Sequence, residues 1–88
     1  MNRYKMNIYE KAVSFFGKEK QLLKLCEECA ELIAAIHHFN DGKISEQDLA
    51  SELADVEILI MQAKYIVNND LIEIEKDIKL KRLYDLLI

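Results

Sequence analysis

Four acidic residues placed symmetrically about one short polar stretch constrain the fold more than any other feature of this sequence. Glu28 and Asp55 lie 27 positions apart, Glu31 and Glu52 lie 21 positions apart, and both pairs share the midpoint 41.5. The stretch at that midpoint, residues 40–43, is Asn-Asp-Gly-Lys, which is a strong turn signal. Two helices that fold back at this turn place Glu31 level with Glu52 and Glu28 level with Asp55. The sequence therefore predicts an antiparallel helical hairpin.

The same four acids predict a metal site. Each arm spaces its two acids by three residues, which puts them on one face of a helix. Carboxylates that meet in this way repel one another unless a cation lies among them. On the second arm the acids share their side with Val56 and Leu59, and acids among apolar residues are costly to bury unless they are paired or bind a metal. All four acids are therefore predicted to bind a divalent ion.

The composition favours an all-α fold, because the 88 residues include no Pro and only two Gly. A chain of this length makes a single domain, residues 1–88, and gains stability from oligomerisation. We expect the hairpin with flanking helices to form a four-helix-type bundle when copies assemble. The predicted helices, with the capping residues that delimit them, are Asn7 to Phe16 (ended by Gly17), Lys18 to about His38 or Phe39, Ser45 (with Asp48) to about Val67, and Leu71 to about Leu87 after Asn68.

The charge pattern excludes several functions. Residues 1–26 carry a net charge of +4, residues 27–57 carry −8, and residues 58–88 are balanced. The acidity therefore belongs to the hairpin, and no basic surface supports nucleic-acid binding. No apolar stretch has the length of a signal peptide or a membrane span, so we expect a cytoplasmic protein without membrane association.

The ligand types indicate which ion is bound. Carboxylates without an accompanying His suit a hard ion, Mg²⁺ first and Mn²⁺ second. A di-iron bundle would need Glu-x-x-His, but Ala34 and Ala35 stand three residues before His37 and His38. Mg²⁺ held by few carboxylates completes its shell with waters and substrate phosphates. Hydrolysis of a phosphoanhydride is therefore the chemistry that the acids predict.

The acidic pattern resembles the signature of a known family. Glu27-Glu28-x-x-Glu31, twenty intervening residues and then Glu52-x-x-Asp55 are similar to the motif of MazG-like nucleotide pyrophosphohydrolases, in the all-α NTP pyrophosphatase superfamily. The residues around the acids are similar too, and the resemblance covers most of the chain. Because the motif fixes five acids, their spacing and the intervening length, it is specific.

The resemblance implies a Mg²⁺-requiring nucleoside triphosphate pyrophosphohydrolase. Such an enzyme cleaves NTP or dNTP to the monophosphate and pyrophosphate, in nucleotide pool control or house-cleaning. It implies that Glu28, Glu31, Glu52 and Asp55 bind metal, and that Glu27 orients the water, acts as base or completes the outer shell. It also implies a homodimer or dimer of dimers, with helices of two chains around each site.

Further residues are candidate substrate contacts. Members of the family commonly place a basic pair in the last helix near the phosphates, and Lys79 and Arg82 match it. Gln21 and Lys24 share the acidic face two turns and one turn before Glu28, respectively, so we expect either to touch the substrate. The chain has no Trp, so stacking on a base would fall to Phe15, Phe16, Tyr4 or Tyr65.

Two other functions stay open. One is a non-catalytic helical interaction or regulatory module whose acids form a solvated face. The other is a relative that hydrolyses a different anhydride, such as phosphoribosyl-ATP. Cys26 and Cys29 form a Cys-x-x-Cys, but they lie on the apolar stripe of a helix without a second Cys pair. They are predicted to be buried thiols, with no role in zinc binding or redox chemistry.

Overall fold

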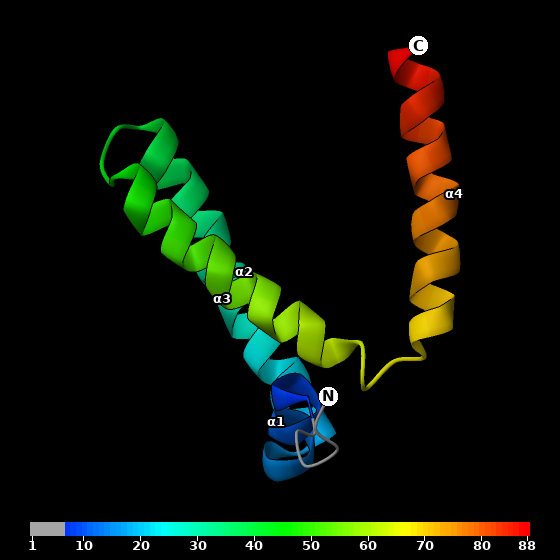
Figure 1. The fold of residues 1–88 in the computed structure, drawn as a ribbon. Coiled ribbons are helices and arrows are strands. Elements are labelled where there is room, and N and C mark those ends of the chain that lie inside the picture. Colours follow the sequence, from blue (N-terminus) through cyan, green and yellow to red (C-terminus); the bar gives the residue numbers. More distant parts are fainter. Residues whose placement is uncertain (1–6) are drawn as a thin grey trace.

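The computed structural model describes residues 7–88, which form a helical hairpin with one helix added at each end. The helices are α1 (Ile8–Phe16), α2 (Lys18–Asn40), α3 (Glu46–Ala63) and α4 (Asn69–Leu87) (Figure 1). No strand occurs in residues 7–88, so the predicted all-α class is confirmed. α2 and α3 run antiparallel along each other, and the short α1 packs against both at the open end of the hairpin (Figure 1).

The turn at the tip of the hairpin ends α2 through backbone hydrogen bonds. Gly42 has a φ of 73°, in the left-handed region that glycine adopts without steric cost. Its N–H donates to the Phe39 carbonyl (3.0 Å), and the N–H of Lys43 donates to the His38 carbonyl (2.8 Å). Together these bonds form a Schellman motif, which satisfies carbonyls that a helix end would otherwise leave free.

Side-chain caps start three of the helices, as predicted. The Asn7 and Asn68 side chains each accept a hydrogen bond from the backbone N–H two residues further on, at 2.8 and 2.9 Å. Ser45 and Asp48 form a reciprocal capping box: Ser45 Oγ accepts from the Asp48 N–H (3.1 Å), and Asp48 Oδ2 accepts from the Ser45 N–H (3.0 Å). Between α1 and α2, Gly17 with a φ of 98° ends the first helix and begins the second.

The end of α3 differs from the prediction. The helix stops at Ala63, four residues before the predicted end at Val67. The Tyr65 N–H instead donates to the Gln62 carbonyl, and the Ile66 N–H donates to the Ala63 carbonyl, both at 2.9 Å. These i→i−3 bonds form a tighter turn than the α-helix, and this turn ends α3 before the segment that leads to α4.

The buried core of the described chain is small and lies within the hairpin and under α1. Its apolar members are Val13, Ala35, Val56 and Leu59, each 6 or 7% exposed. Val56 and Leu59 are the apolar neighbours that the sequence placed beside Glu52 and Asp55. Burial of these residues therefore fixes the face of α3 that carries the acids.

α4 stands apart from the hairpin. It packs against none of the other helices, and none of its residues is buried (Figure 1). An ion pair between Lys64 Nζ and Glu73 Oε2, at 3.8 Å, links it to the segment that follows α3. The apolar residues Leu71, Ile74 and Ile78 are about half exposed. A single chain therefore shows three packed helices, and the four-helix arrangement is not formed within it.

The capping box at the start of α3 gives the first prediction. Replacing Ser45 by Ala removes the acceptor for the Asp48 N–H and should lower the free energy of unfolding by about 1 kcal/mol. Urea unfolding followed by circular dichroism measures the change. Ser51→Ala, the same substitution at an exposed interior position of α3, is the matched control and should cost less. Equal losses in the two variants would contradict a stabilising cap.

Candidate metal centre

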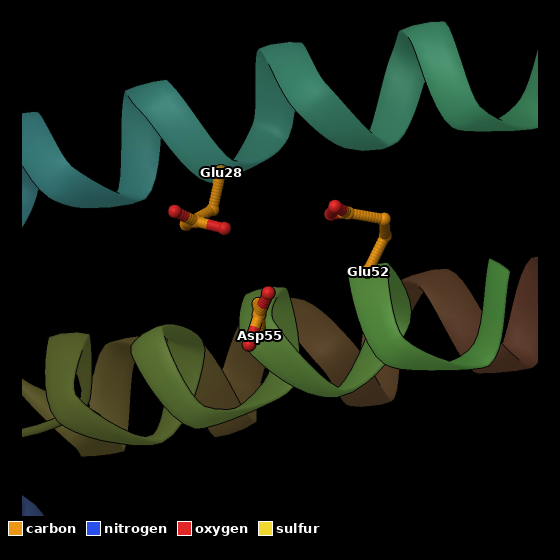
Figure 2. A group of neighbouring side chains, drawn as sticks. All are labelled: Glu28, Glu52 and Asp55. Atoms are coloured by element: carbon orange, nitrogen blue, oxygen red, sulfur yellow. The ribbon is translucent and has the colours of Figure 1, made fainter. Parts of the chain in front are cut away.

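Three carboxylates from the two arms of the hairpin meet between α2 and α3. Glu28 extends from α2 toward Glu52 and Asp55 on α3 (Figure 2). One oxygen from each of the three lies within 4.8 Å of the other two. Three of the four acids predicted to bind a metal are thus brought together, although Glu28 lies 24 positions before Glu52 and 27 before Asp55 in the chain.

The cross-helix contacts confirm the predicted register of the hairpin. Glu28 and Asp55 lie close together, as a midpoint of 41.5 requires. Two turns further from the tip, Gln21 Nε2 donates to Gln62 Oε1 at 2.7 Å, and this pair has the same midpoint. The two arms therefore keep one alignment over the length of the site.

The cluster is partly withdrawn from water, and this makes its charges unfavourable. Glu28 is 9% exposed. Burial raises the pKa of the Glu28 carboxyl above its ordinary value, the neighbouring carboxylates of Glu31 and Asp55 raise it further, and Lys24 opposes the shift. Glu52 Oε2 is enclosed without any hydrogen-bond partner. A buried carboxylate oxygen without a partner is costly, so the site has the electrostatic character of a cation site.

Glu31 and Glu27 lie at the edges of this cluster. Glu31 is exposed and is not one of the three acids that meet, although its carboxylate contributes to the raised pKa of Glu28. Glu27 is also exposed, and its Oε1 pairs with Lys24 Nζ at 3.4 Å. The structure thus separates the five acids of the motif into three that converge and two that border them.

Two hollows open on either side of the carboxylates. One, of 360 Å³, is lined by Glu28 and Asp55 together with Gln21, Lys24, Ile58, Leu59 and Gln62. The other, of 380 Å³, lies toward the hairpin tip and is lined by Glu31, Glu52 and His38, with Ala34, Ala35, Ile44, Asp48 and Ser51. A ligand coordinated by the acids would therefore have room in both directions along the hairpin.

The predicted substrate contacts divide between two places. Gln21 and Lys24 lie in the hollow beside Glu28, and Lys24 Nζ is 3.6 Å from Glu28 Oε2. Lys79 and Arg82 lie on α4, which does not touch the hairpin of its own chain, and Lys79 pairs with Glu75 at 3.9 Å. Within one chain, the structure does not bring the basic pair to the carboxylates.

The aromatic candidates for stacking on a base are dispersed. Phe16 lies beside Gln21 in a separate hollow of 480 Å³ on the outer side of α2. Phe15 is 82% exposed and packs edge to face on Phe16. Tyr65 is exposed after the end of α3, and Tyr4 lies outside the described residues. The two hollows described beside Glu28, Glu52 and Asp55 are not lined by Phe15, Phe16 or Tyr65.

The prediction that Cys26 and Cys29 are buried is wrong for the single chain, where both thiols are exposed. They lie on a face of α2 that neither α1 nor α3 covers. The apolar residues Leu22 and Ile33 are exposed on α2 as well, at 38 and 61%. The prediction assumed that the whole apolar arc of α2 would be buried, but α1 and α3 cover only part of it.

Gln62 is the site residue that sequence reasoning missed. It is 7% exposed, pairs with Gln21 and lines the hollow beside Glu28. The symmetry that located the acids also locates Gln62 opposite Gln21, and this was the available signal. A glutamine carries no charge pattern, so nothing else in the sequence points to it.

Comparisons of the chain with protein-family models, with curated proteins and with solved structures found no match. No helix in residues 7–88 combines the length and the apolar character needed to cross a membrane. What the fold and site define is an α-helical hairpin with three converging carboxylates, Glu28, Glu52 and Asp55, that could hold a metal ion.

The raised pKa of Glu28 predicts a pH-dependent gain from removing its charge. In a chelating buffer, Glu28→Gln should raise the melting temperature at pH 7, because the charged carboxylate is disfavoured in the folded chain. The gain should be present above the raised pKa and vanish well below 4.5, where the carboxyl is protonated in both the folded and unfolded states. Thermal unfolding by circular dichroism from pH 3 to 8 tests this. Glu57→Gln, an exposed acid on another side of α3, should show no such gain.

Proposed function

We propose that this chain is a Mg²⁺-dependent nucleoside triphosphate pyrophosphohydrolase, which cleaves NTP or dNTP to the monophosphate and pyrophosphate. One observation carries the proposal: Glu52 Oε2 is enclosed without a partner in a cluster that also contains Glu28 and Asp55. A folded protein tolerates such an oxygen when a ligand completes it. The resemblance of the acidic motif to MazG-like pyrophosphohydrolases supports the same function.

The donor set fits a hard divalent ion. The converging ligand atoms are all carboxylate oxygens, without nitrogen or sulfur, which favours Mg²⁺ and admits Mn²⁺. Glu28, Glu52 and Asp55 would hold the ion, with Glu31 completing the set. When bound, Mg²⁺ neutralises phosphate charge, polarises the phosphoryl group and activates water for attack.

The remaining residues of the site have roles that follow from their positions. An acidic hollow repels a triphosphate, and Lys24, beside Glu28, supplies a positive charge against it. Glu27 and Glu31 are exposed at the border of the cluster, where either carboxylate can hold a water or accept its proton. The hollow of 380 Å³ toward the hairpin tip has room for the pyrophosphate.

A second copy of the chain completes this proposal. The chain exposes 7196 Å², whereas a compact monomer of its mass exposes about 5,400 Å². Its radius of gyration is 16.0 Å, against about 12 Å for a compact domain of this length. The unpacked α4 is the source of the excess, and in a homodimer or dimer of dimers it would cover the exposed apolar face of a partner's hairpin. Lys79, Lys81 and Arg82 form a basic stretch within α4 that is complementary in charge to the acidic hairpin, so Lys79 and Arg82 would reach the phosphates from the neighbouring copy.

The unpacked α4 also favours a second candidate function, a helical interaction module without catalysis. In that case the apolar stripe of α4 binds a different protein, and the acids of the hairpin need no metal. The response to metal and the hydrolysis assay below separate the two functions.

The hydrolysis assay tests the proposal through the α3 acids. Pyrophosphate release is measured with Mg²⁺ across the eight common NTPs and dNTPs. The unaltered chain should hydrolyse at least one of them, and Glu52→Gln or Asp55→Asn should lower the rate by at least about a thousandfold while the helical circular dichroism is kept. Glu57→Gln should keep full activity, since Glu57 lies outside the cluster. Full Mg²⁺-dependent activity in both cluster variants would contradict the proposal.

Metal binding is tested separately from turnover. Mg²⁺ or Mn²⁺ at a hundred times its dissociation constant should stabilise the fold by about 2.7 kcal/mol, because the ion binds the folded state only. Glu52→Gln should lose most of this gain, and Glu57→Gln should keep it. An unchanged melting temperature in the unaltered chain would favour the interaction module.

Assembly is tested on α4. Ile78→Glu places a charge in the apolar stripe formed with Leu71 and Ile74, and should turn the oligomer into monomers in analytical ultracentrifugation. Lys76→Glu, which introduces the same side chain on the opposite face of α4, should leave the oligomer intact. A monomeric unaltered chain would contradict the proposed assembly.

A further inference from the structure

Two buried glutamines form a polar contact that the metal site does not use. Gln21 on α2 is 9% exposed, Gln62 on α3 is 7% exposed, and Gln21 Nε2 donates to Gln62 Oε1 at 2.7 Å. Apart from Glu28, they are the buried polar side chains of the described residues. Among the described residues, the buried side-chain atoms without a hydrogen-bond partner do not include those of this pair, so the unused groups of the two amides face accessible space where a ligand can reach them.

The contact between the two amides leaves most of their hydrogen-bonding capacity unused. It consumes one N–H of Gln21 and one lone pair of Gln62. Neither side chain makes another hydrogen bond to residues 7–88, so the Gln21 carbonyl and the Gln62 NH₂ group remain available. Both residues line the 360 Å³ hollow that Glu28 and Asp55 also line. That hollow therefore offers an acceptor and a donor side by side.

The position of the pair relative to the carboxylates matches the length of a nucleotide. Gln21 precedes Glu28 by seven residues, and Gln62 follows Asp55 by seven. Two helical turns correspond to about 10 Å along each helix, in the same direction from the cluster. A phosphate held at the acids would leave the nucleoside lying toward the glutamines.

The walls of the hollow suit a nucleobase. Ile58 and Leu59 are the two apolar residues among the seven that line it, so a flat ring meets apolar surface on the α3 side and polar groups at its edge. A volume of 360 Å³ falls within the range of small-molecule sites. The hollow beside Phe16 contains Gln21 but neither Gln62 nor any of the three converging acids, so it lacks this combination.

We propose that Gln21 and Gln62 read the hydrogen-bonding edge of the substrate's base, in the hollow beside Glu28 and Asp55. This inference rests on the proposed function and adds the residues that decide specificity. Every common base presents a donor next to an acceptor on its pairing edge. While Gln21 donates to Gln62, the free Gln21 carbonyl and the free Gln62 NH₂ group match one polarity of that edge, and the pair discriminates bases by that polarity. A base without matching groups leaves the amides unpaired and is rejected.

The test uses the full chain, its Gln62→Met variant and, as matched control, Gln47→Met, which makes the same change at an exposed position of α3. Turnover is measured as kcat/KM for each NTP and dNTP with Mg²⁺. Gln62→Met should lower kcat/KM for the preferred base by about tenfold, the loss of one neutral hydrogen bond, and should flatten the preference among bases. Gln47→Met should leave both unchanged. A purely structural glutamine contact would lower stability and leave the order of preference intact, which would overturn the inference.

A second test measures ligand binding to the unaltered chain, so it does not depend on whether a variant folds. The side-chain amide resonances of Gln21 and Gln62 are followed by NMR while the four nucleoside monophosphates, and ribose 5-phosphate as a probe without a base, are added with Mg²⁺. The amides should shift with the preferred base and stay in place with ribose 5-phosphate. Base-dependent shifts without any hydrolysis would refute the proposed activity and leave base recognition standing. Hydrolysis without amide shifts would do the opposite, and no binding at all would overturn both.

Discussion

The single alignment of α2 against α3 is the constraint on which the rest of the molecule depends. The hydrogen-bonded turn at Gly42 fixes the tip of the hairpin, and Gln21 meets Gln62 near the open end. Between them, Glu28 faces Asp55. A shift of one residue along either helix would rotate its side chains by about 100° and separate every one of these pairs. Packing and hydrogen bonding thus both favour one register.

That register brings like charges together on a small core. Val56 and Leu59 are buried next to the acids of α3, so the apolar packing that holds the hairpin closed also holds the carboxylates near one another. The cost of this arrangement is visible in the pKa of Glu28, which burial and then the carboxylates of Glu31 and Asp55 raise, and in the unpartnered Glu52 oxygen. Apolar packing therefore keeps the hairpin folded although it holds unfavourable charges close together. This arrangement is typical of sites that bind a ligand.

Local signals and symmetry were predictable from the sequence, and long-range packing was not. The caps at Asn7, Ser45 and Asn68 act through neighbouring residues, so the helix starts follow from a few letters of sequence. The convergence of three acids follows from spacing about one turn. The exposure of Cys26 could not be predicted from the sequence, because an apolar arc on a helix does not indicate which part of it another helix will cover. The apolar periodicity of α4 predicts a helix, but it does not indicate that this helix stands apart from the rest of its own chain.

The two glycines show that free space and permitted substitution are different things. At Gly17 and Gly42 no atom lies within 4 Å of where a side chain would begin, so a steric inspection would accept any residue. Their φ angles of 98° and 73° nevertheless disfavour every L-residue with a side chain. The Gly17 carbonyl accepts a hydrogen bond from the Gln21 N–H at 3.1 Å. At this residue the chain turns from α1, which packs against α3, into α2. A substitution at Gly17 or Gly42 would change the path of the backbone. It would therefore alter the carboxylate cluster, although neither glycine touches it.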